Sequence, residues 1–364
     1  MGQDDQTKGA RLPPLPGRGA GANPPGRFES RALEDDPEWR ELQRLEGETP
    51  RRRTRFHQDQ SRSVLSWNDS PDLPFRVALN PYRGCEHGCA YCYARPTHEY
   101  HGLSAGLDFE SEIFFKPQAP ALLTEALSRP DWEPQVIALS GVTDAYQPVE
   151  RRLEITRRCL EVLLRFRNPV GIVTKNDLVL RDLDLLRELA AQHLVHVTLS
   201  VTSLDAQLSQ RLEPRAAPPQ RRLEAISALA QAGVPVGVLT APAIPGLNDH
   251  ELPAILEHAA QQGAQYATYI LLRLPHGVKA VFSTWLQQHR AGEAEKVLNA
   301  IRAMRGGNLN ETRFGVRKRG EGVRADALAS LFELTRRKLG LMNQPPVLAT
   351  RNFQRPAPAQ GSLF

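Results

Sequence analysis

Residues 80–93 of this chain read NPYRGCEHGCAYCY, and the interpretation of the whole sequence starts from this stretch. It holds three of the four cysteines, Cys85, Cys89 and Cys92, in a C-x3-C-x2-C spacing. Thiolates this close together rarely remain free, because they bind a metal or a cluster or become oxidised. Three thiolates are one fewer than a closed zinc site or a fully ligated four-iron cluster needs. A cluster held here would therefore keep one iron open to an outside ligand.

The spacing, with the aromatic Tyr91 directly before the last cysteine, resembles the signature of the radical S-adenosylmethionine (SAM) superfamily. The resemblance implies that the three cysteines hold a [4Fe-4S] cluster, and that the amino and carboxylate groups of SAM occupy the fourth iron. It also implies reductive cleavage of SAM to a 5′-deoxyadenosyl radical, which abstracts hydrogen from a substrate. An electron donor such as flavodoxin or ferredoxin would reduce the cluster. The alternative is a zinc knuckle with His87 or His98 as the fourth ligand.

The composition is that of a soluble globular protein of 364 residues, with 41% hydrophobic and 24% charged residues. Four cysteines, three of them clustered, fit a reducing cytoplasm better than a disulfide scaffold. The first ten residues, MGQDDQTKGA, contain no apolar segment typical of a secretory signal. No apolar run is long enough to span a bilayer. The sequence therefore predicts a cytoplasmic protein that does not interact with membranes.

From residue 76 onward, strand-like apolar segments alternate with amphipathic helical segments. The expected strands are 76–80, 135–140, 170–175, 195–202, 234–241 and 266–272. The expected helices lie near 118–128, 150–166, 181–192, 218–232, 249–262 and 280–290. Alternation of this kind predicts parallel β/α units, and six units predict an α/β fold that is an open, partial (β/α)6 TIM barrel over residues 70–305. The resemblance implies the same architecture.

The two ends of the chain depart from this pattern. Residues 1–60 are expected to form a flexible arm, because Gly and Pro crowd the stretch 12–26, with a short helix possible at 31–46. Residues 306–345 are expected to form a basic extension with a helix at 325–339, and 346–364 a tail. Residues 306–364 carry 10 basic and 4 acidic residues. This excess suggests nucleic-acid binding through residues 306–340, although the same charges would also solvate a loop or complement a helix dipole.

In β/α barrels the chemistry collects where the strands end at their carboxyl side. The second expected strand ends in Ser140, Gly141, Thr143 and Asp144, and the resemblance assigns these residues to the amino group of SAM. An ordinary turn in which Asp144 caps a helix is the alternative. Lys175 ends the third strand and is a candidate for the SAM carboxylate or a substrate phosphate, or is simply exposed.

The fourth and fifth expected strands supply the remaining candidates. By resemblance, Ser200 and Arg215 contact the ribose and carboxylate of SAM; a surface ion pair between Arg215 and Glu213 is the alternative. The stretch APAIPGLND at 241–249 partly resembles the family's G-x-I-x-G-x-x-E segment, in which an apolar residue packs against adenine. Ile244 and Gly246 match that segment by position.

Two further residues follow from their positions alone. Cys159 lies on the apolar face of an expected helix and is predicted to belong to the core. Arg273 ends the sixth expected strand and is a candidate for contact with the substrate.

Within the superfamily, the chain is most similar to the spore photoproduct lyase-like branch, through the stretches DFESEIFFK at 108–116 and TDAYQPVE at 143–150. Lyases of that branch use a cysteine after the second strand as hydrogen donor, whereas this chain reads SGVTDAY at 140–146. The substrate therefore stays open, with nucleic acid as one possibility. A zinc-stabilised nucleic-acid-binding module and a non-catalytic iron–sulfur protein are the rival hypotheses.

Overall fold

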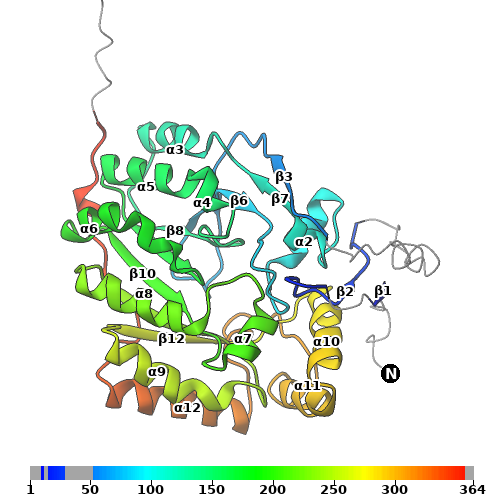
Figure 1. Ribbon diagram of the computed structural model, residues 1–364. Helices are drawn as coiled ribbons and strands as arrows, with labels where there is room; N and C mark the ends of the chain where they lie inside the picture. The colour runs from blue at the N-terminus through cyan, green and yellow to red at the C-terminus, as the bar shows by residue number, and fades with distance from the viewer. Residues whose placement is uncertain (1–9, 12–14, 29–51, 357–364) are drawn as a thin grey trace, which may run out of the picture.

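The computed structural model describes residues 10–11, 15–28 and 52–356, and its main feature is a seven-stranded sheet (Figure 1). The strand order is β12-β11-β10-β9-β8-β5-β4. Six of these strands are parallel: β5 (Val77–Leu79), β8 (Ile137–Leu139), β9 (Val170–Thr174), β10 (Val195–Ser200), β11 (Val236–Ala243) and β12 (Tyr266–Leu271). They coincide with the six expected strands, so the predicted α/β partial barrel is confirmed. The edge strand β4 (Leu65–Trp67), which runs antiparallel to β5, was not expected.

Helices follow the parallel strands; most lie along the outer face of the sheet, and those at 278–289 and 294–303 lie together at one end of it (Figure 1). They are α3 (Ala119–Ser128), α4 (Glu150–Leu153), α5 (Ile155–Phe166), α6 (Leu183–Ala191), α7 (Ala206–Leu212), α8 (Pro219–Gln231), α9 (Leu252–Gln261), α10 (Val278–His289) and α11 (Ala294–Ala303). The single helix expected at 150–166 is divided at Glu154, whose left-handed backbone (φ 50°, ψ 30°) ends α4 and begins α5. Such a conformation cannot continue a right-handed helix.

The core lies between the sheet and these helices. Strand residues such as Val170, Ile172, Val197 and Leu199 are fully buried, as expected for parallel strands covered on both faces. Each aliphatic side chain of this kind stabilises the fold by roughly 1.5–3 kcal/mol relative to an exposed one. Cys159 on α5 is 0% exposed and belongs to this core, as predicted.

A second, three-stranded sheet lies beside the start of the barrel. It consists of β3 (Arg55–Gln58), β7 (Glu112–Phe115) and β6 (Tyr82–Arg83) in that order, with the four-residue helix α2 (Asp108–Ser111) directly before β7. β3 is parallel to β7, and β6 is antiparallel to it. The strands are too short and too polar to stand out in the sequence. This small sheet fixes the two ends of the cysteine-bearing loop against each other.

The expected flexible arm is wrong for its described parts. Residues 55–58 form β3, and the backbone amides of Gly19 and Ala20 donate hydrogen bonds to the Glu110 carboxylate at 2.9 and 2.8 Å. Only glycine fits at position 19, because a Cβ there would lie 1.8 Å from the carbonyl oxygen of Gly88. The strands β1 (Ala10–Arg11) and β2 (Ala22–Asn23) pair in the same segment. The helix expected at 31–46 lies outside the described residues.

The C-terminal extension covers the free edge of β12. Lys318 O accepts a hydrogen bond from Leu271 N at 2.8 Å, and Met342 exchanges backbone hydrogen bonds with the start of β12. Helix α12 (Val323–Lys338) packs beside α9 (Figure 1), with the rings of Phe332 and Tyr269 4.7 Å apart. An uncovered strand edge would leave backbone groups unpaired, so this extension completes the open barrel. The division of the chain into domains otherwise stays a prediction.

No helix within the described residues is long and apolar enough to cross a membrane.

Candidate functional site

The three clustered cysteines lie on a tightly held loop between β6 and the Arg95–His101 turn of 3-10 helix. Cys85 N donates to Phe109 O and Ala90 N donates to Leu212 O, both at 2.9 Å. Gly88 adopts φ +65°, and a Cβ on it would lie 2.4 Å from a carboxylate oxygen of Glu110. The loop therefore needs glycine at this turn, and its path is fixed by contacts with distant segments.

A buried arginine holds this loop from beneath. Arg95, fully buried, donates to the carbonyl oxygens of Gly88 (3.1 Å) and Cys89 (2.9 Å) and to those of Ala105 (3.2 Å) and Gly106 (2.7 Å). It also forms an ion pair with Glu110 at 2.9 Å. Neither side chain was predicted to matter, because no short-range pattern distinguishes Arg95 from a surface arginine.

The thiols are free, and their surroundings suit ligation to a cationic centre. Burial raises the pKa of Cys85 well above its ordinary value, and the nearby Asp144, Cys89 and Cys92 raise it further. Burial also raises the pKa of Cys89. Thiolates in this loop would therefore need a compensating positive charge, which a bound metal ion or cluster would supply. The backbone amides of His87 and Ala94 donate towards Cys85 and Cys92, as amides do towards sulfur ligands of clusters.

Of the two histidines considered as a fourth zinc ligand, His87 has both ring nitrogens engaged, whereas His98 Nδ1 is buried without a partner among the described residues. His87 Nδ1 lies 3.4 Å from Asp144 Oδ2 and its Nε2 lies 3.2 Å from Asn176 Nδ2. His98 Nε2 lies 2.8 Å from Glu112 O, and burial lowers its pKa to about 4. Within the described residues, no three His, Cys, Asp or Glu side chains are arranged around one metal position.

Asp144 lies at the end of β8 with both carboxylate oxygens occupied. Oδ1 accepts from Tyr146 N (2.9 Å) and Thr174 Oγ1 (2.8 Å), and Oδ2 accepts from Lys175 N (2.8 Å) beside the His87 ring. Burial by itself would raise the pKa of Asp144, but His87 and these hydrogen bonds outweigh burial and lower the pKa to about 2. The carboxylate thus ties the ends of β8 and β9 to the cysteine loop.

The depressed pKa predicts how Asp144 stabilises the fold. Because the ionised carboxylate is favoured in the folded state, its contribution is complete above pH ~4 and is lost as the pH falls towards 2. Asp144→Asn should therefore lower the free energy of unfolding by about 2 kcal/mol at pH 7, with a smaller difference at pH 3. Urea unfolding at both pH values measures this, with the exposed Asp69→Asn as control. A difference that does not change with pH would contradict the assignment.

Lys175, Ser200 and Tyr91 are brought together at the ends of β9 and β10. Lys175 Nζ donates to Ser200 Oγ at 2.6 Å and to Ala241 O at 3.4 Å, and it lies 5.9 Å from the centre of the Tyr91 ring. The predicted positions of these three residues therefore converge beside the cysteine loop. A half-buried ammonium group at this point is available to a carboxylate of a bound molecule.

A buried hydrogen-bond network around Glu213, which was not predicted from the sequence, lies next to Lys175 and Tyr91. Glu213 forms an ion pair with Arg222 and accepts hydrogen bonds from Tyr91 and Thr202. Both members of the ion pair are buried, which fixes the Tyr91 hydroxyl. The alternative pairing of Arg215 with Glu213 is wrong, because Arg215 Nη2 lies 2.8 Å from Glu86 Oε1.

Most of the other predicted residues lie in the loop after β8 or in the apolar cluster beside the cysteines. Ser140 Oγ accepts from Ala145 N, and Thr143 Oγ1 donates to Gly84 O at 2.6 Å, so both hydroxyls shape the loop after β8. Gly141 O accepts from the hydroxyl of Tyr93 at 2.7 Å. Ile244 is fully buried in the apolar cluster that contains Cys89 and Tyr91.

Gly246 lies on a turn after β11 rather than beside the cysteines. Its φ is +78°, its amide donates to Asp249 Oδ1 at 2.9 Å, and a Cβ on it would face Val297 and Ala300 of α11.

The basic residues of the C-terminal extension are largely paired within the chain. Arg317 pairs with Asp72, Arg313 with Glu311 and Glu321, and Arg324 with Asp249. These pairs favour the alternative that the charges hold a loop over the barrel. Nucleic-acid binding through residues 306–340 stays a prediction.

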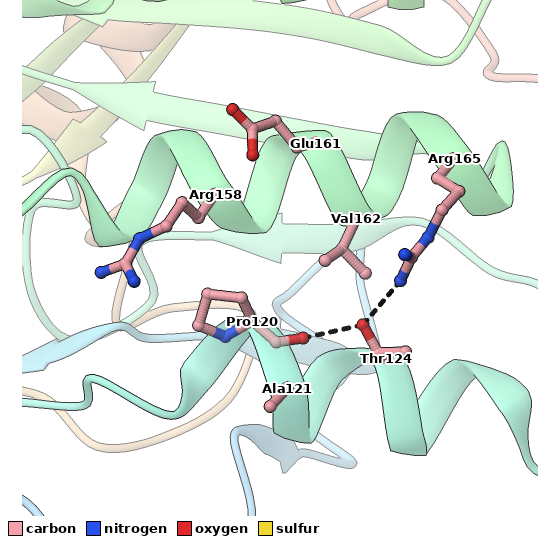
Figure 2. Close-up of a pocket in the computed structure, with 7 residues that line it drawn as sticks. All are labelled: Pro120, Ala121, Thr124, Arg158, Glu161, Val162 and Arg165. Atoms are coloured by element: carbon pink, nitrogen blue, oxygen red, sulfur yellow. Dashed lines mark hydrogen bonds between the residues drawn. The ribbon is translucent and has the colours of Figure 1, made fainter. Parts of the chain in front are cut away.

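A shallow groove on the outer surface lies between α3 and α5, away from the cysteines (Figure 2). Its walls include Val162, Arg158 and Arg165, and the Arg165 guanidinium donates to Thr124 Oγ1 at 2.9 Å. The groove has none of the thiols or strand-end polar groups described above, so it is not the candidate site.

Comparison with known proteins finds relatives of this chain. The family model of the Radical SAM superfamily matches residues 79–259. The uncharacterised protein Rv2578c of Mycobacterium tuberculosis is 37% identical over 236 residues, which are 64% of this chain and 69% of the relative. The uncharacterised protein MJ0683 of Methanocaldococcus jannaschii is 30% identical over 176 residues, 48% of this chain and 63% of the relative.

Solved structures of spore photoproduct lyase have the same fold. A mutant with bound AdoMet and dinucleoside spore photoproduct matches with a TM-score of 0.59 at 16% identity, covering 87% of this chain and 88% of that chain. A second mutant matches with the same TM-score and coverage at 17% identity.

Proposed function

Because this chain belongs to the radical SAM superfamily, and is therefore a radical SAM enzyme, we propose that Cys85, Cys89 and Cys92 hold a [4Fe-4S] cluster whose open iron binds SAM. The observation that carries the proposal is the loop of three free thiols, which is fixed by Arg95 and faces strand-end polar groups. When bound, the cluster and SAM together supply a 5′-deoxyadenosyl radical that abstracts hydrogen from the substrate. The protein supplies ligation, orientation and exclusion of water.

Lys175 and Ser200 are suited to bind the carboxylate of SAM. The ammonium group lies against Ser200 Oγ, and its nearest acid, Glu213 at 3.9 Å, is already paired with Arg222. The positive charge of Lys175 is therefore available to pair with a carboxylate of a ligand, while Glu213 holds the Tyr91 hydroxyl in place.

The loop after β8 is suited to bind the amino group of SAM through its backbone. Both oxygens of Asp144 are occupied, so we assign Asp144 to positioning this loop and Lys175 rather than to direct contact. The carbonyl group of Ser140 is the alternative acceptor for an ammonium group, since that of Gly141 already accepts from the Tyr93 hydroxyl. Ile244 and its apolar neighbours would cover adenine and exclude water.

The substrate is not identified by this arrangement. The loop after β8 reads SGVTDAY at 140–146 and carries no cysteine, and its Val142 packs against the buried cluster of Cys85, Ala94 and Phe109. A mechanism that uses a cysteine of this loop as hydrogen donor is therefore not available to this chain. We propose hydrogen abstraction from an organic substrate, with an external electron donor, and with nucleic acid as one candidate.

The direct test is reductive cleavage of SAM. Protein reconstituted with iron and sulfide without oxygen should be brown, with a broad absorption band near ~400 nm. After reduction it should form 5′-deoxyadenosine and methionine from SAM, which liquid chromatography with mass spectrometry measures. A colourless protein, or one that binds iron and leaves SAM intact, would contradict the proposal.

Lys175→Met provides a test of the SAM site. Loss of the ammonium group should weaken SAM binding by about tenfold or more, because a charge-assisted hydrogen bond contributes roughly 1.5–3 kcal/mol. Iron content should stay unchanged. Equilibrium dialysis with labelled SAM measures the affinity, and Lys296→Met, an exposed lysine on α11, is the matched control. Equal affinities for the two variants would exclude Lys175 from the site.

A further inference from the structure

The carboxyl end of β12 carries buried positive charge without a partner. Arg305 is 1% exposed and donates from Nη2 to Leu272 O, but its Nε and Nη1 have no hydrogen-bond partner within the described residues. Arg273 follows Leu272 in the chain, and its Nε is likewise buried and unpartnered in the part of the chain that the structure describes. A buried guanidinium without an acceptor is costly, so these donors point to a ligand that the protein alone does not supply.

The acidic side chains nearest to Arg273 and Arg305 already have partners within the chain. Asp72 accepts from Gly315 N at 2.7 Å and pairs with Arg317. Glu311 accepts from Arg313 and from the backbone amide of Thr312. Arg317 and Lys318 add further positive charge close to Arg273. Beyond the effect of burial, the charge of Arg317 lowers the pKa of Arg273, and the charge of Arg273 lowers the pKa of Lys318. Positive charge is therefore in excess around Arg273 and Arg305.

This charge lies beside the cysteine loop. The Arg273 guanidinium is 5.6 Å from the centre of the Tyr93 ring, and Tyr93 directly follows Cys92. The Tyr93 hydroxyl in turn donates to Gly141 O in the loop after β8. A group held by Arg273 would thus approach the candidate site at the strand ends, where a substrate must bind.

We propose that Arg273 and Arg305 form a subsite for a phosphate group of the substrate, an assignment that rests on the proposed function of the neighbouring site. Three unpartnered nitrogen atoms on two guanidinium groups offer more donors than one carboxylate needs, because a single guanidinium already satisfies both carboxylate oxygens. A phosphate presents further oxygen atoms and a second negative charge, so it accepts from both arginines at once.

The experiment measures binding of inorganic phosphate to the full-length reconstituted protein by isothermal titration calorimetry. Arg273→Gln and Arg305→Met should each weaken phosphate binding by about tenfold or more, since each removes charge-assisted hydrogen bonds. Arg302→Gln, which removes a charge from the last turn of α11 and whose partner is Asn299, is the matched control and should bind phosphate like the unmodified protein.

Thermal unfolding provides a second readout, which separates loss of phosphate binding from a general weakening of the fold. Without phosphate, Arg305→Met should melt at the same temperature as the unmodified protein or higher, because it removes an uncompensated buried charge. With phosphate, only the unmodified protein and Arg302→Gln should gain stability. A lower melting temperature for Arg305→Met combined with an intact response to phosphate would overturn the proposal.

Further ligands identify the source of the phosphate. A 5′-mononucleotide and a short single-stranded oligonucleotide are compared with inorganic phosphate. Tighter binding of the oligonucleotide would indicate that the substrate is a nucleic acid. Equal affinities for the three ligands would indicate that the substrate is a small phosphorylated molecule. Succinate that binds more tightly than phosphate would overturn the assignment to phosphate. Phosphate binding is measured without SAM turnover, so its failure leaves radical SAM chemistry intact, and failure of SAM cleavage leaves the phosphate result readable.

Discussion

Replacement of Cys85, Cys89 or Cys92 by alanine is expected to abolish iron binding. Each thiolate of a three-cysteine site ligates a different iron of the cluster, and burial disfavours the uncompensated thiolates that would remain. Iron and sulfide per protein should fall to the background of the assay in each single variant, with loss of the absorption band near ~400 nm. SAM cleavage should be lost with the cluster.

Cys159→Ala is the matched control for these three variants. Cys159 is more buried than the three loop cysteines and lies in the core on α5, among aliphatic side chains. The substitution leaves a small cavity and should lower the free energy of unfolding by about 1 kcal/mol, with iron content unchanged. Full iron retention in any of the three loop variants, or its loss in Cys159→Ala, would contradict the ligand assignment.

Arg95→Met is expected to destabilise the fold and the cluster together. The substitution leaves the Glu110 carboxylate buried, with the amides of Gly19 and Ala20 as its remaining partners among the described residues. It also removes the donor to the carbonyl oxygens of Gly88 and Cys89. Breaking a buried ion pair in this way costs about 3–5 kcal/mol.

The free energy of unfolding in urea and the iron content measure these two effects. Arg129→Gln, which removes an exposed pairing with Asp131, should leave both stability and iron content unchanged, because solvent screens such a pair. If the double variant Arg95→Met, Glu110→Leu regains stability but not iron, the arginine acts mainly by positioning the loop. Iron content equal to that of the unmodified protein in Arg95→Met would refute that role.

The barrel could be predicted from sequence because its signals are local. Apolar strand segments such as VGIVT at 170–174 differ in period and composition from the helices between them, and strand ends follow from that alternation. The spacing of Cys85, Cys89 and Cys92 is likewise local, so it indicated ligation before any geometry was known. The convergence of Tyr91, Lys175 and Ser200 followed from the rule that parallel strands end at one edge.

The partners of charged residues could not be predicted in this way. Arg317 pairs with Asp72 across 245 positions, and the amides of Gly19 and Ala20 meet Glu110 across about 90. No periodicity connects such residues, because ion pairs and hydrogen bonds require only that the folded chain bring two groups within contact distance. For this reason residues 15–28 and 55–58 were mistaken for a flexible arm.

The sequence alone thus determined the parallel α/β barrel and the three-thiol loop, both of which are encoded by short-range spacing and hydrophobic period. Only the tertiary structure decided that Asp144 is fully engaged, that Arg95 holds the loop, and that three nitrogen atoms of Arg273 and Arg305 are buried without acceptors among the described residues. Burial and hydrogen-bond satisfaction depend on every segment that packs around a group, and they therefore emerge only when the whole chain is folded.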